Sequence, residues 1–267
     1  MTAANGIARF HPAVQAWFAS AFEGPTAAQQ QGWSAIDDGS DTLVAAPTGS
    51  GKTLTAFLWS IDSLLRRGLA GDMPQGIDVV YVSPLKALSS DIEKNLVAPL
   101  AGIREAALAM GLDPPVIKTA LRTGDTPQAA RQAIVRDAPH ILITTPESLY
   151  LMLTAERSRE LLRNVRTVIV DELHALMRDK RGSHLALTLA RLDALCETRP
   201  LRVGLSATIH PIEDAARFLV GTGREDASGA PRCTIVDVGH QRDLDLAVEV
   251  PPTDMQAVAP AEQWSEI

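Results

Sequence analysis

The 267-residue sequence is poor in aromatic residues and in cysteine, and each shortage excludes a class of protein. Phe, Trp and Tyr make up only 4% of the chain, which argues against an all-β sandwich built on aromatic strand pairs. The two cysteines, Cys196 and Cys233, lack the spacing of a zinc site. One disulfide between them is possible, but we expect two reduced thiols in a cytosolic protein.

The sequence also lacks long hydrophobic runs and an excess of positive charge. Its apolar stretches are strand-sized, far below the ~18 residues of a membrane span, and no secretory signal opens the chain. Lys and Arg total 25 against 32 Asp and Glu, so the net charge is −7. We therefore expect a cytoplasmic protein without a membrane partner, in which any nucleic-acid site is local rather than a general basic coat.

Short β-branched runs recur along the chain, and most are followed by a longer segment of helical periodicity. Nearly continuous apolar runs are typical of strands buried on both faces, so the pattern predicts an α/β fold with a predominantly parallel sheet and helices on both faces. The predicted strands are Thr42–Ala45, Ile77–Val82, Val116–Leu121, Ile141–Thr144, Thr167–Val170, Arg202–Leu205 and Thr234–Val238. The predicted helices are Gln29–Ile36, Thr53–Arg67, Leu85–Met110, Pro127–Arg136, Leu161–Arg163 and Ser183–Leu195.

A loop of small residues, Ala-Pro-Thr-Gly-Ser-Gly-Lys-Thr, joins the first predicted strand to a helix. Its backbone N–H groups can form a nest for phosphate oxygens at the positive end of that helix. Lys52 would contact the β- and γ-phosphates of a nucleotide, and the Thr53 hydroxyl would ligate Mg²⁺. Ala46 stands where the pattern GxxxxGK[ST] has its first glycine. The predicted nucleotide contacts in the loop are Thr48, Gly49, Ser50, Gly51, Lys52 and Thr53.

Two adjacent carboxylates, Asp171 and Glu172, directly follow the predicted strand Thr167–Val170. Ligands of α/β folds bind at the carboxyl ends of the strands, so this pair is placed for catalysis. We predict that Asp171 holds Mg²⁺, that Glu172 deprotonates the attacking water, and that His174 senses the γ-phosphate region. An Asp-Glu pair alone is typical of a helix N-cap and His174 alone can be structural, but the upstream phosphate loop favours catalysis.

Two weaker motifs flank these residues. Gln29 could place an amide against the adenine edge, because glutamine donates and accepts at once. The alternative is an ordinary helix start with Thr26 as its N-cap. Ser206 and Thr208 follow another strand, where their hydroxyls either couple the nucleotide state to movement or form a simple turn.

Three further strand ends carry hydroxyls, helix starts and a few cations. Such groups suit the phosphates of a single strand, although each segment alone is typical of a capped helix start. Their recurrence at one edge of the sheet favours strand binding. The basic run Arg178, Lys180 and Arg181 is either a solvated face or a nucleic-acid contact. The predicted nucleic-acid contacts are Pro84, Lys86, Arg122, Thr123, Gly124, Thr144, Thr145 and Glu147.

Taken in order, these segments resemble the motifs of superfamily 2 helicases, over about the first 220 residues. Arg-Thr-Gly-Asp-Thr at 122–126 and Arg-Gly-Ser-His at 181–184 most resemble the Lhr (large helicase-related) family. The resemblance implies a RecA-like P-loop NTPase that uses ATP and Mg²⁺. It also implies a motor that tracks 3′ to 5′ on single-stranded DNA and unwinds duplexes in DNA repair, with DNA favoured over RNA.

Motors of this family need two RecA-like domains, and the second supplies an arginine finger. We expect a RecA-like ATP-binding domain over residues 1–240 and, over 241–267, a linker or the start of a second domain, which would be a partner in cis or in trans. Alone, the chain should bind ATP–Mg²⁺, hydrolyse it weakly and unwind little. The alternative is a nucleotide-dependent binding module, against which Glu172 argues because a binder needs no water-activating carboxylate. A P-loop kinase is disfavoured because no acceptor-binding lid is evident.

Overall fold

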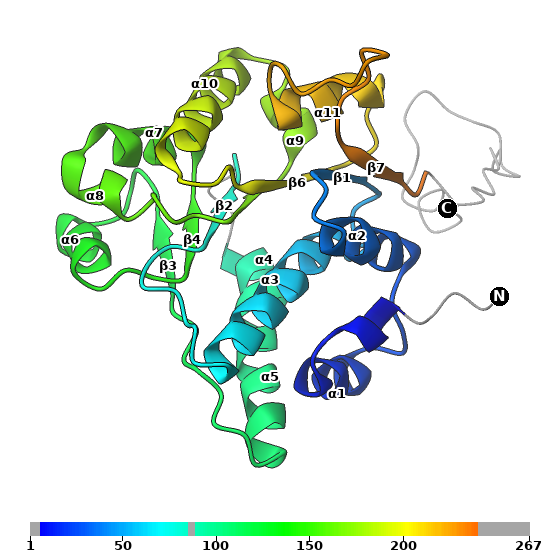
Figure 1. Cartoon of the computed structure of the whole chain (residues 1–267), viewed down its shortest axis with the longest axis vertical. Helices are drawn as coiled ribbons and strands as arrows, with labels where there is room; N and C mark the ends of the chain where they lie inside the picture. The colour runs from blue at the N-terminus through cyan, green and yellow to red at the C-terminus, as the bar shows by residue number, and fades with distance from the viewer. Residues whose placement is uncertain (1–5, 85–88, 240–267) are drawn as a thin grey trace, which may run out of the picture.

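A seven-stranded parallel sheet forms the centre of the computed structural model, which describes residues 6–84 and 89–239 (Figure 1). The strand order is β3-β4-β2-β5-β6-β1-β7. All six strand pairings within the described residues are parallel, as the apolar runs predicted. The strands are β1 (Thr42–Ala45), β2 (Val79–Val82), β3 (Thr119–Arg122), β4 (Ile141–Thr144), β5 (Thr167–Val170), β6 (Leu201–Ser206) and β7 (Thr234–Asp237).

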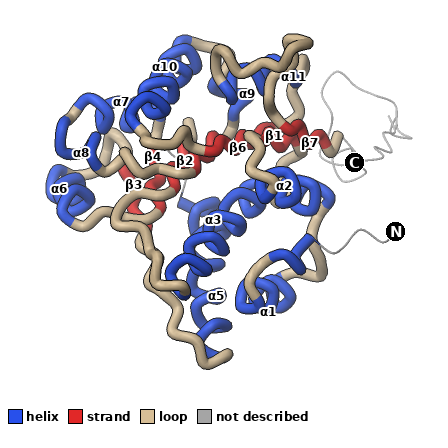
Figure 2. Tube along the Cα trace, viewed as in Figure 1, coloured by secondary structure: helices blue, strands red, loops and turns tan. Residues whose placement is uncertain are grey.

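Helices cover both faces of this sheet, as Figure 2 shows. One layer contains α1 (Pro12–Ala21), α2 (Ala27–Asp37), α3 (Lys52–Leu69) and α5 (Ala98–Ala109). The opposite layer contains α7 (Pro146–Thr154), α9 (Leu173–Leu176), α10 (Lys180–Leu195) and α11 (Ile212–Val220). The shorter elements are a 3₁₀ turn (Gly6–Arg9), α4 (Ser89–Ile92), a π turn (Glu93–Val97), α6 (Gln128–Arg136) and α8 (Glu156–Glu160).

Each buried strand supplies both cores, because successive side chains point to opposite faces. Val79 and Tyr81 of β2 pack with the layer of α2 and α3, whereas Val80 and Val82 pack with the layer of α7 and α10. The register pairs Val82 with Val170 in the neighbouring strand. The carboxyl ends of the strands therefore meet at one edge of the sheet, and the sequence motifs lie at this edge.

Most of the predicted elements are confirmed, with shifted boundaries. The strand predicted at Ile77–Val82 begins two residues later, and that predicted at Val116–Leu121 becomes Thr119–Arg122. The helix predicted at Leu161–Arg163 is wrong: these residues form a turn after α8, closed by a bond from Leu162 N to Arg159 O. Three residues cannot sustain a helix, and the chain must turn here to enter β5.

The long helix predicted over Leu85–Met110 is confirmed from Ser89 to Ala109, where helical conformation is continuous but one turn has π-type hydrogen bonding. Residues 85–88 lie outside the described part of the chain, and α4, the π turn and α5 follow. Pro99 opens α5 and has no N–H to give to the preceding turn, which accounts for the irregular hydrogen bonding before it. The predicted domain boundary at residue 240 and the segment 241–267 likewise lie outside the described residues.

Helices α7, α8 and α9 were not among the predicted helices, and neither were α1 and α11. Both have readable start signals: Pro12 opens α1 behind the N-cap His11, and α11 carries two acids in its first turn before Gly221 ends it. Phe18 of α1 packs edge-to-face on Trp33 of α2, with ring centroids 5.8 Å apart. The few aromatic residues of this chain are thus concentrated where α1 joins the rest of the domain.

Both cysteines are free thiols, as expected. Burial raises the pKa of the Cys196 thiol to about 11, so this group is protonated at neutral pH and unreactive. In the segments that the structure describes, no helix combines the length and apolarity needed to cross a membrane.

Candidate nucleotide and nucleic-acid site

The phosphate loop leaves the sheet at the end of β1. Ala46 N donates to Ser206 O of β6 at 3.1 Å, and Ser50 N donates to Pro47 O at 3.3 Å, which closes the turn. Gly51 has φ +79°, a left-handed conformation that favours glycine. Helix α3 then begins at Lys52, so that its N-terminal N–H groups face the loop.

The residues of this loop fit a nucleotide triphosphate. Lys52 is only 6% exposed, and within the described residues it forms no ion pair. The Oγ atom of Ser50 is buried and has no hydrogen-bond partner in the part of the chain that the structure describes. A buried hydroxyl without a protein acceptor is costly unless a ligand supplies one, and a largely buried lysine without an ion pair is placed to bind an anion. Phosphate oxygens at the N-terminus of α3 would supply both the acceptor and the anion, with Thr53 in the first turn of the helix.

Gln29 links helix α2 to this loop. Thr26 is the N-cap of α2, as the simpler interpretation held, and it forms a full capping box with Gln29. Gln29 Oε1 accepts from Thr26 N at 2.9 Å, while Thr26 Oγ1 donates to Ser50 O at 2.8 Å. The Gln29 side chain is 3% exposed, and its Nε2 lies so close to Gly51 that a β-carbon there would be 2.5 Å away. Its role towards adenine stays a prediction.

The acidic pair begins with Asp171, which lies at the carboxyl end of β5 and is 6% exposed. Its carboxylate accepts hydrogen bonds from the Tyr81 hydroxyl and from Glu172 N, the latter at 2.7 Å. Burial raises the pKa of Asp171, and the charge of Glu172 raises it further, whereas the hydrogen bonds and Lys52 lower it. Lys52 is therefore close enough to act on Asp171 electrostatically, as a shared phosphate and metal site requires.

Tyr81 is a residue of the candidate site that the sequence did not indicate. It lies in β2, the strand next to β5, and it stacks on Phe57 of α3 with ring centroids 4.8 Å apart. Burial and the negative charge of Asp171 raise the pKa of its hydroxyl, which therefore stays a donor. The only signal in the sequence was a polar aromatic residue near the end of an otherwise apolar strand.

His174 connects the acidic pair to the segment after β6. Its Nδ1 accepts from Ala207 N at 3.2 Å and lies 3.5 Å from Ser206 Oγ. Its Nε2 lies 3.2 Å from Glu172 Oε2, so the neutral ring carries its proton on Nε2 and donates it to that carboxylate. Glu172 itself has a left-handed backbone with φ +51°. The predicted coupling segment and the predicted catalytic residues are thus in direct contact, while Thr208 lies two residues beyond Ser206.

The predicted nucleic-acid segments meet at the carboxyl ends of β2, β3 and β4. Thr144 Oγ1 donates to Arg122 O at 2.8 Å, and Thr123 N donates to Thr126 Oγ1 at 2.8 Å in the adjacent turn that contains Gly124. Thr145 caps α7 by accepting from Ser148 N. Thr144 is fully buried, so its hydroxyl holds β3 to β4 rather than facing solvent. Lys86 lies outside the described residues.

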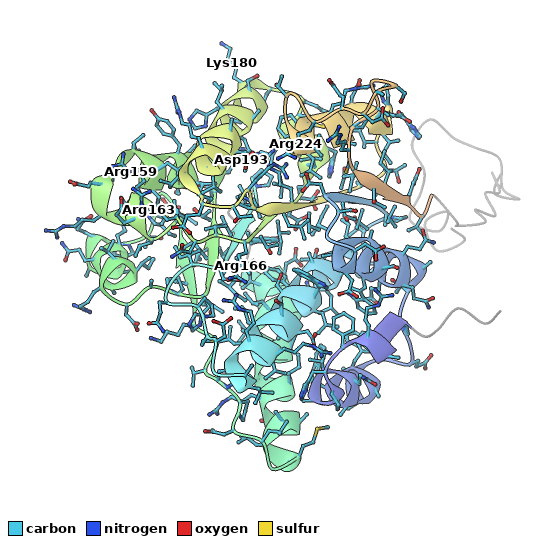
Figure 3. All side chains as sticks on the ribbon, viewed as in Figure 1. Arg159, Arg163, Arg166, Lys180, Asp193 and Arg224 are labelled. Atoms are coloured by element: carbon cyan, nitrogen blue, oxygen red, sulfur yellow. The ribbon has the colours of Figure 1, made fainter. Side chains whose placement is uncertain are left out.

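Arg181 ties these segments to the start of α10. Its Nε donates to Glu147 Oε1 at 2.7 Å, and its Nη2 donates to Pro84 O at 3.2 Å. Gly182 follows because a β-carbon there would lie 2.1 Å from Leu176 O of α9. Lys180 points away from the domain (Figure 3). The basic run is therefore divided between an internal bridge and a solvated end, which its charge pattern alone did not reveal.

A parallel sheet with a phosphate loop and an acidic pair at its carboxyl edge defines a P-loop NTPase domain. Residues 26–215 match the model of the DEAD/DEAH box helicase family. This match covers more than half of the chain, which belongs to that family.

Individual relatives point to the Lhr helicases within superfamily 2. The chain is 50% identical to "Lhr helicase/probable uracil glycosylase" of Mycolicibacterium smegmatis over 264 residues, which cover 99% of this chain and 17% of that protein. It is 47% identical to "ATP-dependent helicase Lhr-Core" of Methanothermobacter thermautotrophicus, over 94% of this chain and 29% of that protein. The resemblance read from the motifs is confirmed, and the chain spans less than a third of these relatives.

Solved structures confirm the RecA-like fold. The structure of Mycobacterium smegmatis helicase Lhr bound to ssDNA and AMP-PNP matches 98% of this chain and 32% of that chain, with a TM-score of 0.82 and 50% identity. The DEAD-box helicase Mss116 bound to ssRNA and UDP-BeF matches 85% of this chain and 43% of that chain, with a TM-score of 0.67 and 20% identity. The latter similarity concerns the fold alone.

Proposed function

We propose that this chain is the ATP-binding first motor domain of an Lhr-like, ATP-dependent nucleic-acid helicase or translocase. The observation that carries the proposal is the phosphate loop itself: the buried Ser50 Oγ has no hydrogen-bond partner among the described residues, and Lys52, which is 6% exposed, forms no ion pair with them. Ser50 lies just before α3 and Lys52 is the first residue of this helix, where its charge acts on the buried carboxylate of Asp171. Cationic and neutral donors beside one buried acid match a triphosphate with a divalent cation.

We then assign a role to each candidate residue at the carboxyl edge of the sheet. Lys52 and the loop N–H groups hold the phosphates, and Thr53 and Asp171 would hold Mg²⁺, which neutralises charge developing on the transferred phosphoryl group. Glu172 takes the proton of the attacking water, and His174 holds that carboxylate in place through Nε2. Gln29 contacts the adenine. Tyr81 positions Asp171 through its hydroxyl.

The substrate we propose is single-stranded nucleic acid, lying across the loops at the carboxyl ends of β2, β3 and β4. Two observations support it: predicted contact residues within the described part of the chain meet there, and the solved Lhr relative is bound to ssDNA. We propose DNA, 3′ to 5′ movement, a role in DNA repair and a cytoplasmic location from the likeness to Lhr helicases. A second RecA-like domain, in cis or in trans, would complete the motor.

Calorimetric titration of Lys52→Ala with a non-hydrolysable ATP analogue and Mg²⁺ tests the nucleotide site. Removing the Lys52 ammonium should weaken binding by at least about tenfold, as expected for lost charge-assisted hydrogen bonds. Lys180→Ala is the matched control, because this lysine is exposed and points away from the domain. Equal affinities of the two variants for the analogue would refute the proposed function.

A further inference from the structure

A cleft between α6 and α8 is lined by arginines and by no carboxylate among the described residues. It has a volume of about 600 Å³, and Figure 1 shows the two helices side by side at the flank next to β3. Its polar lining consists chiefly of Arg122, Gln128, Arg131, Gln132, Arg136 and Arg157. Four guanidinium groups in one cleft are unexpected in a chain whose net charge is −7.

The pairing of arginines elsewhere in the domain makes this cleft unusual. Within the described residues, nine other arginines form ion pairs with carboxylates. None of the four cleft arginines does, and the nearby acids Asp137 and Glu160 pair with Lys118 and Arg163 instead. On the same flank, Arg159 has its Nε atom buried without a hydrogen-bond partner (Figure 3).

Two of the cleft arginines, Arg122 and Arg131, lie close enough for their charges to act on each other. Burial lowers the pKa of Arg122, and the charge of Arg131 lowers it further. Arg131 donates to Thr126 O and Gly124 O, both at 2.8 Å, and so fixes the turn that follows Arg122. The like charges of Arg122 and Arg131, held together without an ion pair among the described residues, favour the binding of an anion, and planar guanidinium groups match phosphate best.

The position of the cleft indicates which phosphates it would take. Arg122 ends β3, the edge strand of the sheet, and its carbonyl accepts from Thr144 of the adjacent β4. The cleft is therefore continuous with the loops at which we place the nucleic-acid strand. A strand that crosses β2, β4 and β3 in turn would leave the sheet at Arg122 and meet α6 and α8 next.

We infer that the cleft between α6 and α8 binds the sugar-phosphate backbone of the same nucleic acid, as an extension of the strand track beyond the edge of the sheet. The inference rests on the proposed function for the existence of that track. Arg136 and Arg157 contact phosphates without reading bases, and Arg131 holds the turn between the two parts of the track.

The test compares two double variants of the whole chain that lose the same charge. Arg136→Ala with Arg157→Ala removes two of the four cleft arginines, whereas Arg104→Ala with Arg232→Ala removes two arginines that line no part of the cleft. Fluorescence anisotropy with labelled long and short oligodeoxythymidylates gives the affinity at several salt concentrations. The cleft variant should lose at least about tenfold in affinity for the long strand at low salt, and less for the short one. For the cleft variant, the slope of log affinity against log salt concentration should be shallower by about 1.4, which corresponds to two lost phosphate contacts on a single strand.

Further measurements separate the remaining outcomes. Gln132→Glu, which places a negative charge at an exposed position of the cleft, should weaken strand binding in the same direction without removing an arginine. Equal losses in the two double variants, or no strand binding by the unsubstituted chain, would overturn the inference. The inference would also be overturned if only the cleft variant lost the calorimetric binding of inorganic phosphate while its affinity for the strand stayed unchanged. If the unsubstituted chain binds no nucleotide, the proposed function itself fails, and this result can be told apart from a failure of the cleft inference.

Discussion

Single residues at the carboxyl edge of the sheet serve as polar partners for one another. Tyr81 donates to Asp171, and His174 donates to Glu172 while it accepts from Ala207 N. Because these groups are partly or fully removed from water, each lost partner leaves a buried group unsatisfied, at a cost of about 1–3 kcal/mol. The nucleotide site is therefore sensitive to positions that would not themselves touch the nucleotide.

Gly51 is such a position, and its replacement by alanine is a sharp test of the loop. A β-carbon would meet Gln29 Nε2 at 2.5 Å, and Gln29 cannot yield freely because it is hydrogen-bonded to Thr26. We expect Gly51→Ala to lose about 2–4 kcal/mol of unfolding free energy, from left-handed strain and overpacking together, and to bind the ATP analogue more weakly.

Gly49→Ala is the matched control for that variant. Gly49 also has a left-handed backbone, with φ +83°, but its added β-carbon would meet nothing within 4 Å. It should therefore lose only the backbone strain, about 1–2 kcal/mol. Urea unfolding followed by circular dichroism measures both values, and equal losses in the two variants would show that the contact with Gln29 is unimportant.

At the scale of elements, the start of α10 connects the acidic pair to the loops that we assign to nucleic-acid binding. The chain passes from Glu172 through α9 to the N-cap Asp179, and two residues later Arg181 reaches Glu147 of α7 and the carbonyl of Pro84. Gly182 allows this close approach, because α9 leaves no space for a β-carbon. A displacement of the acidic segment would therefore move the loops that we assign to strand binding.

Replacing Arg181 by alanine should weaken strand binding by about threefold to tenfold. The Arg181–Glu147 pair is about half exposed, so the pair itself contributes at most about 1 kcal/mol, and the bond to Pro84 O adds a similar amount. The thermal midpoint should change little, because the same bonds hold surface loops rather than the core. Anisotropy with labelled oligonucleotide measures the effect. Lys180→Ala, one residue away and pointing outward, should bind as the unsubstituted chain does.

At the scale of the whole molecule, one sheet carries the candidate sites of one of the two RecA-like domains that the proposed motor needs. The phosphate loop, the acidic pair and the nucleic-acid loops all lie at one edge, and two apolar cores fix that edge from either face. We assign the arginine finger to a second RecA-like domain rather than to this one. Such a finger contributes on the order of 10³–10⁵ in turnover, so its source decides the activity.

The isolated chain should therefore bind ATP–Mg²⁺ but hydrolyse it slowly, with little stimulation by single-stranded DNA. A coupled ATPase assay measures this rate alone and after addition of a separately expressed second RecA-like domain from a related Lhr helicase. Turnover should rise by at least about 10³-fold if the added domain supplies the finger in the correct place. Strong DNA-stimulated hydrolysis by the chain alone would contradict this division of the motor.

The sequence by itself determined the class of fold, the positions of most strands and the family. Apolar strand runs and the order of the motifs are local features, and the loop around Lys52 and the pair Asp171 and Glu172 could be recognised without any contact. Helix ends were predicted less well. At Leu161–Arg163 and before Pro99, the path of the chain and the missing proline donor decided the local structure.

Only the tertiary structure decided which side chains complete the site. Tyr81 reaches Asp171 from 90 residues away, and Arg181 reaches Pro84 from 97. The arginines of α6 and α8 likewise come together only because both helices pack beside the edge strand β3. Such partners carry no local signal, because parallel strands bring together segments that are distant in sequence, and burial then fixes which polar groups must pair.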